Sequence, residues 1–162
     1  MKFSDLHVYI AAPFFNDEQL ETVKSIETEL REQGVKFFSP RSEGVLVDLA
    51  PSERGQHLKV MYDSNIKNMM ECNTMLAVVD GRDIGTMFEI GFFTSKRLSQ
   101  KDNLLITFTN NSFGLNVMIQ QSVDAHLKGV ESLSELLHIS NCNNEICNNQ
   151  LSFFKNFSQD VF

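Results

Sequence analysis

The stretch TMLAVVDGRDIGTMFEIGFF, residues 74–93, decides the fold. Its first part, TMLAVVD at residues 74–80, is almost continuously apolar, as is typical of a central strand covered on both faces in a parallel sheet. A short turn that contains Gly81 and Gly85 follows, and we expect a helix from about residue 85 to residue 97. The stretch therefore predicts one strand-to-helix unit of an α/β protein.

Similar units lie on both sides of this stretch. Upstream, LHVYIAA (6–12) and VKFFS (35–39) predict strands, Asn16 is a good N-cap for a helix that ends before Gly34, and a second helix is expected over residues 54–71. Downstream, NLLITF (103–108) predicts a strand, and LNVMIQQSV and GVESLSELLH predict short helices. Four successive strand-and-helix units in 162 residues predict a single α/β domain, a doubly wound parallel sheet with flanking helices.

The C-terminal segment SNCNNEICNNQLSFFKNFSQDVF, residues 140–162, is rich in asparagine and breaks the alternation of strands and helices. We therefore expect a domain over residues 1–138 and a C-terminal arm over residues 139–162. The arm could be a tail, a linker or a segment that docks on a neighbouring subunit.

The composition excludes several classes of function. A formal net charge of −7 argues against binding to nucleic acid or to anionic membranes, because both need a basic surface. No apolar run approaches the roughly 18 residues of a membrane span. Asp5 and His7 interrupt the N-terminal apolar segment, which predicts a strand and not a signal peptide. The expected partner is a small molecule or another protein.

The chain gives no pattern for a metal or a cofactor. Cys72, Cys142 and Cys147 are odd in number, form no CxxC motif and have no histidine at ligand spacing, which favours free thiols in a reducing compartment such as the cytoplasm and disfavours a metal site. The first loop, AAPFFNDE, has neither a GxGxxG nor a Walker pattern, so dinucleotides and nucleoside triphosphates have no cradle there. We expect neither a metal nor a cofactor.

The residues that follow the strands are the candidates for chemistry, because ligands of open parallel sheets bind beyond the carboxyl ends of the strands. Glu89 is the most unusual, since an unpaired carboxylate among aromatic side chains is costly to bury. Asp83 flanks the same strand-to-helix turn, and the helix N-terminus favours ionised carboxylates. The other candidates are Tyr9, near the end of the first strand, and the residues Phe14, Phe15, Arg41, Ser42, Gly85 and Thr86 that follow the strands. From the residues alone, the site is a pair of carboxylates in a crevice lined with aromatic rings.

Each candidate also has a structural interpretation. Asp83 could be only the N-cap of its helix, and Glu89 could pair with Arg82 or Lys96. At least one residue of the Phe14 and Phe15 pair could belong to the core. Arg41 could be a solvated loop residue. These alternatives stay open at this point.

Three segments in order, VYIAAPFFNDEQ, FFSPRSEG and VVDGRDIGTMFEIGF, resemble the nucleoside 2-deoxyribosyltransferase family. The resemblance covers roughly residues 6–127 and is carried by PFF, by SPR and by the pattern D-x-G-T-x-x-E-x-G. It implies a flavodoxin-like α/β fold and an enzyme of nucleotide salvage that acts on the N-glycosidic bond.

The resemblance also implies a role for each candidate. Glu89 would attack C1′ of the deoxyribose and displace the base, and a second base would then attack the glycosyl ester with net retention. Asp83 would contact the base and help to protonate it. Tyr9, Phe14 and Phe15 would form the walls, with Arg41 and Ser42 near the edge of the base. Asn116 and Met118 would reach into the site of an adjacent subunit, near the sugar 5′-hydroxyl, which implies a homo-oligomer with shared active sites that binds a nucleoside and a free base.

One position departs from the family pattern. The family carries an aspartate on the second helix that binds the sugar hydroxyl, and the segment SNIKNMMECN places Asn65 there. An asparagine can bond a hydroxyl but carries no charge to stabilise an oxocarbenium-like centre. This favours a rival in which the protein sequesters a nucleoside-derived ligand with little turnover. Another alternative is hydrolysis of nucleoside 5′-monophosphates, although AAPFF lacks the Gly/Ser-rich phosphate loop of such relatives.

Overall fold

The computed structural model describes residues 1–43, 51–111 and 114–155, and the side chains of the second range from residue 55 onward. The strands are β1 (His7–Ala11), β2 (Lys36–Phe38), β3 (Thr74–Val78), β4 (Leu104–Thr109) and β5 (Ala125–Lys128). The α-helices are α1 (Asp17–Glu32), α2 (Pro51–Glu71), α3 (Ile84–Ser99), α4 (Val117–Ser122), α5 (Gly129–Asn143) and α6 (Asn148–Phe153). Short 3-10 helices form η1 (Phe3–Asp5), η2 (Pro40–Glu43) and η4 (Asp80–Arg82).

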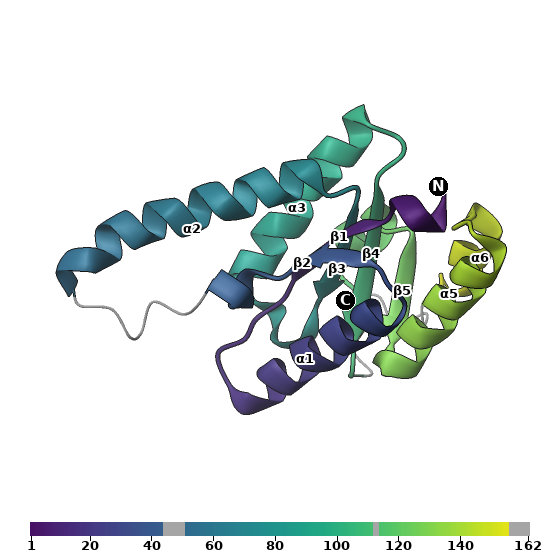
Figure 1. The fold of residues 1–162 in the computed structure, drawn as a ribbon, viewed down its shortest axis with the longest axis horizontal. Helices are drawn as coiled ribbons and strands as arrows, with labels where there is room; N and C mark the ends of the chain where they lie inside the picture. The colour runs from purple at the N-terminus through teal and green to yellow at the C-terminus, as the bar shows by residue number, and fades with distance from the viewer. Residues whose placement is uncertain (44–50, 112–113, 156–162) are drawn as a thin grey trace.

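The strands of the described ranges form one parallel sheet in the order β2-β1-β3-β4-β5 (Figure 1). The direction in which the sheet grows reverses between β1 and β3, which is the switch point of a flavodoxin-like sheet, and ligands of such sheets bind beside it. The predicted doubly wound α/β fold with flanking helices is confirmed. The sequence interpretation missed β5, because AHLK is short and two of its four residues are polar.

The helices form two layers because successive strand residues point to opposite faces of the sheet. Val8 and Ile10 of β1 pack in a core with α1 and α5, whereas Tyr9 and Ala11 pack in a second core with α2 and α3. The candidate catalytic residues belong to the second layer.

Of the long helices, α2 is the one least covered by the rest of the protein. Its C-terminal end packs against β1 and α3, and its N-terminal half projects away from the sheet (Figure 1). Lys96 of α3 fixes the packed end, since its ammonium group donates to the backbone carbonyls of Met69, at 3.1 Å, and of Cys72. These carbonyls are the unsatisfied acceptors at the end of a helix, which a cation satisfies well.

The C-terminal segment contributes to the core of the same chain. Helix α5 continues to Asn143, so the expected domain boundary at residue 138 falls inside it. Beyond it, Ile146, Leu151 and Phe154 pack in the core that contains α1 and α5. None of the helices in the described ranges combines the length and the apolar character needed to cross a bilayer.

Candidate active site

Tyr9 and Glu89 form the centre of the candidate site. The phenol of Tyr9 donates a hydrogen bond to Glu89 Oε1 at 2.7 Å. Tyr9 is fully buried on β1, and Phe38 lies opposite it in the parallel ladder with β2. The two rings stack with their centroids 5.6 Å apart. Two strands and one helix thus hold the phenol against the carboxylate.

The environment of Glu89 changes its acidity. Burial raises the pKa of Glu89 to about 7, the hydrogen bond from Tyr9 acts against this rise, and the charge of Asp83 adds to it. Burial and the neighbouring Glu89 raise the pKa of Tyr9 far above its usual value, so the phenol remains a donor. A carboxyl group with a pKa near 7 is ionised in about half of the molecules at neutral pH, and such perturbed groups cluster at functional sites.

The alternative ion pairs of Glu89 do not form. Lys96 is engaged by the carbonyls at the end of α2, and among the described residues Glu89 has no ion pair with either Lys96 or Arg82. The polar partner that the structure gives to Glu89 is therefore Tyr9.

The turn between β3 and α3 places Asp83 at the start of the helix. Gly81, at a φ of 77°, and Arg82, at a φ of 52°, both adopt the left-handed region, which is strained for the arginine. Asp83 Oδ2 accepts hydrogen bonds from the backbone N–H of Thr86 at 2.8 Å and from its hydroxyl at 3.1 Å, so the N-cap interpretation is confirmed. A Cβ on Gly85 would lie 3.0 Å from the same carboxylate oxygen, which explains the glycine there.

The aromatic pair that follows β1 is only partly covered. Phe14 and Phe15 stack on each other with centroids 5.5 Å apart, and Phe15 is 73% exposed. An exposed ring of this size at the carboxyl end of a strand is available to a planar ligand.

Arg41 is not a free loop residue. Its Nε and Nη2 atoms donate to the two carboxylate oxygens of the buried Glu27, at 2.7 Å and 2.5 Å. Ser42 is exposed and donates to the carbonyl of Ser39 at 2.7 Å. The solvated interpretation of Arg41 is therefore wrong, and a base can meet only the N–H groups that Glu27 leaves unused.

Helix α2 presents an unsatisfied acceptor. Asn65 Oδ1 is buried and has no hydrogen-bond partner among the described residues. On the same helix, Ser64 donates to Glu43 Oε1 at 2.5 Å, and Asn68 donates to the carbonyl of Ser64 at 2.9 Å. A buried oxygen without a donor costs about 1–3 kcal/mol, so a ligand hydroxyl at this point would remove a cost.

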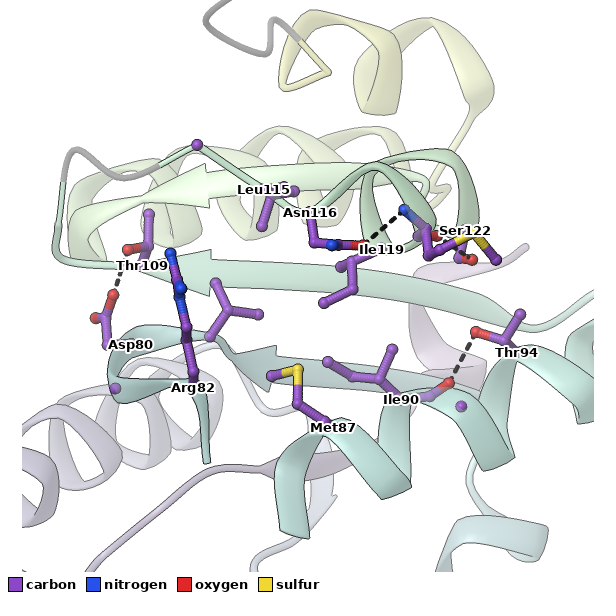
Figure 2. Close-up of a pocket in the computed structure, with 15 residues that line it drawn as sticks. Asp80, Arg82, Met87, Ile90, Thr94, Thr109, Leu115, Asn116, Ile119 and Ser122 are labelled. Carbon is purple, nitrogen blue, oxygen red and sulfur yellow. Dashed lines mark hydrogen bonds between the residues drawn. The ribbon is translucent and has the colours of Figure 1, made fainter. Parts of the chain in front are cut away.

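A large pocket lies beside α3, and Figure 2 shows the residues that line it. It has a volume of about 870 Å³, and Met87, Ile90 and Thr94 face it from α3. At about 100° per residue, Glu89 points to nearly the opposite side of the helix, which explains why it does not line this pocket. We place the candidate site at Glu89, because the perturbed carboxyl and its partner are there.

Asn116 and Met118 line this large pocket. Asn116, which Figure 2 labels, caps α4 by accepting from the backbone N–H of Met118 at 2.9 Å. Met118 is 74% exposed. Within one chain, Asn116 and Met118 lie on the pocket side of α3. Tyr9 is bonded to Glu89 on the other side of this helix. The structure thus brings Tyr9, Asp83, Thr86 and Glu89 together and leaves Asn116 and Met118 apart.

Two residues of the site are absent from the candidates that the sequence suggested, Phe38 and Glu43. Because strand side chains alternate, one of Phe37 and Phe38 had to face the second core, but only the pairing of β2 with β1 decides which. Glu43 follows SPR directly, and its contact with Ser64 joins segments 21 residues apart.

Comparisons with known proteins agree with the observed fold. A family model described as nucleoside 2-deoxyribosyltransferase matches residues 8–125. A 2-deoxyribosyltransferase from the psychrotolerant bacterium Bacillus psychrosaccharolyticus superposes with a TM-score of 0.65 at 24% identity, over 79% of this chain and 90% of that chain. A conserved protein from Enterococcus faecalis V583 gives a TM-score of 0.62 at 17% identity, over 83% and 98% of the two chains. No curated protein sequence gives a significant match.

Proposed function

The chain belongs to the nucleoside 2-deoxyribosyltransferase family, and from this premise we propose that it transfers 2-deoxyribose between nucleobases through a covalent ester on Glu89. The observation that carries the proposal is the hydrogen bond of 2.7 Å from Tyr9 to a carboxyl group whose pKa is about 7. This arrangement supports a nucleophile that is fixed in position and still ionised in a large fraction of molecules.

The first half of the reaction forms the ester. An oxygen of ionised Glu89 bonds to C1′ while the bond from C1′ to the base nitrogen breaks, and the bonding electrons leave with the base. The base nitrogen gains a proton, which the Asp83 side of the site helps to deliver. Tyr9 keeps the carboxylate oriented, because its phenol does not ionise in the working pH range.

The second half reverses these steps with another base. A nitrogen of the incoming base bonds to C1′ and gives up its proton on the Asp83 side of the site, the ester bond breaks, and Glu89 recovers its charge. Two displacements at the same carbon give net retention. Asn65 accepts a hydrogen bond from a sugar hydroxyl in this proposal, which satisfies its orphaned oxygen.

The test is base exchange followed by chromatography, with 2′-deoxyuridine as donor and adenine as acceptor, and with the other common bases in turn. Glu89→Ala removes the nucleophile and abolishes exchange, whereas Glu135→Ala, an exposed carboxylate on α5, leaves it unchanged. If the wild-type protein exchanges no pair of common bases, the proposal is wrong.

A second candidate function, sequestration of a nucleoside-derived ligand, is favoured by one observation. Position 65 has an amide where a charge would promote turnover, although its buried oxygen still suits binding. Calorimetry with 2′-deoxynucleosides distinguishes the two functions. Tight binding with the ligand intact after hours supports sequestration, and rapid release of free base contradicts it.

A homo-oligomer with shared sites completes the proposal. Among the described residues, nine of the eleven exposed large apolar side chains lie on α2, α3 and α4, and α1 and α5 carry none. The nine are Leu58, Val60, Tyr62, Met70, Ile84, Phe88, Leu98, Val117 and Met118. Exposed apolar side chains that gather on neighbouring elements mark interaction sites, which supports an interface on this helix layer. A second copy on this face could bring its Asn116 and Met118 to Glu89.

A further inference from the structure

Two acceptors meet beside α2, one from α2 itself and one from the end of η2. Asn65 contributes a buried Oδ1 without a donor among the described residues. Glu43 contributes a carboxylate that Ser64, the residue before Asn65, holds at 2.5 Å. An ionised carboxylate only accepts hydrogen bonds, so this side of the site offers acceptors to a ligand that carries donors.

The position of Glu43 connects it to the reacting carboxyl group. Glu43 ends η2, which begins two residues after Phe38, and the ring of Phe38 stacks on Tyr9. The negative charge of Glu43 is close enough to raise the pKa of the Tyr9 phenol, which itself donates to Glu89. Glu43 therefore belongs to the surroundings of the Tyr9 and Glu89 pair.

The proposed reaction needs negative charge near the sugar, and the other residues of the site do not supply enough of it. Positive charge develops on the sugar as the bond to the base breaks. Asn65 is neutral, and Asp83 Oδ2 already accepts two hydrogen bonds from Thr86. Once the ester forms, Glu89 is neutral as well. A further fixed negative charge near the sugar would stabilise the transition state.

We propose that Glu43 and Asn65 divide one task, in which Asn65 Oδ1 accepts the hydrogen bond of a sugar hydroxyl and Glu43, positioned by Ser64, supplies the negative charge that position 65 lacks. This inference rests on the proposed deoxyribosyl transfer. Glu43 is exposed, so water screens its field, and a bound nucleoside that displaces this water strengthens the interaction.

The experiment is a double-mutant cycle on base exchange between 2′-deoxyuridine and adenine. Glu43→Gln keeps the size of the side chain, removes the charge and lowers kcat by roughly ten- to a hundredfold, as expected for a lost charge-assisted interaction. Asn65→Asp in the Glu43→Gln background restores the charge at the neighbouring position and recovers most of kcat. Asn65→Asp alone gives no gain, because two adjacent carboxylates oppose each other's ionisation.

Two matched variants separate charge from structure. Glu135→Gln, on the opposite helix layer, leaves kcat unchanged. Ser64→Ala frees the Glu43 carboxylate and gives a smaller loss of kcat than Glu43→Gln, with the same unfolding midpoint as the wild type. Rescue by Asn65→Asp is the decisive result, because a merely structural role of Glu43 gives no rescue.

The inference and the proposed function fail in different ways. If the wild type exchanges bases and Glu43→Gln is as active, or if Asn65→Asp rescues nothing, the division of roles is wrong and the transferase remains. If the wild type exchanges nothing, the same cycle is measured as the Kd for 2′-deoxyuridine by calorimetry. A Kd that Glu43→Gln weakens and Asn65→Asp restores supports the inference for a binding protein, and no binding overturns it.

Discussion

Burial of the ionised Glu89 carboxylate costs free energy of folding, and the hydrogen bond from Tyr9 offsets this cost only in part. We therefore expect the stability of the protein to depend on pH. Its pKa is raised from 4.5 to about 7 in the folded chain. The folded state therefore binds more protons than the unfolded state between these values, so the free energy of unfolding is highest below pH 4.5 and falls as the pH rises to about 7.

The first prediction follows from this cost. Glu89→Gln removes the ionisation, so the variant loses less stability than the wild type between pH 5 and pH 8. The difference is at most about 3 kcal/mol, because each pKa unit corresponds to about 1.4 kcal/mol. Urea unfolding at both pH values measures it. Equal losses in the two proteins would show that Glu89 titrates normally.

The second prediction concerns the phenol that faces Glu89. Tyr9→Phe removes the hydrogen bond that lowers the pKa of Glu89, so the acid limb of the exchange rate moves upward from about pH 7. A shift of about one pH unit is expected for the loss of one hydrogen bond to a charged group. The pH profile of kcat/KM measures the shift, and an unmoved limb with a lower maximum would indicate a purely steric role for Tyr9.

Sequence reasoning identified Glu89 correctly as unusual but could not supply its partner. A carboxylate in MFEIGFF is anomalous wherever the helix packs. Tyr9 lies 80 residues away, and the contact depends on which face of β1 meets α3. Arg41 illustrates the same limit, since its pairing with Glu27 requires knowing how η2 lies against α1.

At the scale of elements, Asp83 caps α3 at the turn after β3, and the proposed function gives it a second, chemical role. The third prediction separates the two roles. Asp83→Asn retains an oxygen for the N–H of Thr86 and keeps the stability of the wild type within about 0.5 kcal/mol, whereas Asp83→Ala loses about 1 kcal/mol.

Both Asp83 variants lose base exchange if Asp83 also serves the leaving base, because neither side chain can pass on a proton. Urea unfolding and exchange kinetics on the same preparations measure the two effects. An Asp83→Asn protein with full activity would leave Asp83 with the cap alone.

Elements with a strong pattern were predictable, and elements defined by their neighbours were not. The apolar run of β3 and the cap of α1 at Asn16, which accepts from Gln19 at 2.9 Å, follow from local chemistry. Strand β5 became recognisable only as the partner of β4. Helix α6 was hidden in an asparagine-rich segment because its few apolar residues pack on a core built from elsewhere in the chain.

For the whole molecule, the two helix layers differ in what they expose. Among the described residues, α1 and α5 expose no large apolar side chain, whereas α2, α3 and α4 expose nine. Right-handed crossovers between parallel strands only limit the possible sheet orders, and the observed order also includes β5, which the sequence interpretation missed. The exposed apolar side chains of α2, α3 and α4 could not be predicted, because they depend on which sides of these helices the core leaves uncovered.

The fourth prediction tests this face. Met118→Glu places a charge on it and converts the oligomer to monomers, whereas Phe153→Glu, at a similarly exposed position on α6, does not. Light scattering after gel filtration measures the mass. A wild-type protein that is already monomeric would contradict the interface.

The fifth prediction tests whether the sites are shared. Glu89→Ala and Asn116→Ser are each deficient in exchange, and serine retains the cap of α4. When the two variants are mixed and reassembled, a heterodimer contains one site with an intact Glu89 and an intact Asn116 from its partner, so activity returns. If the mixture stays as inactive as its parts, each site uses residues of one chain.

The bond between Tyr9 and Glu89 also makes the protein its own optical reporter. The chain has two tyrosines and no tryptophan, and the second tyrosine, Tyr62, is exposed on α2. A Tyr62→Phe protein therefore emits through Tyr9 alone. A carboxylate that accepts a hydrogen bond from a phenol quenches its emission, and a protonated or esterified carboxyl group quenches less. The emission of one ring thus follows the protonation of Glu89, and it would report the proposed ester without any added label.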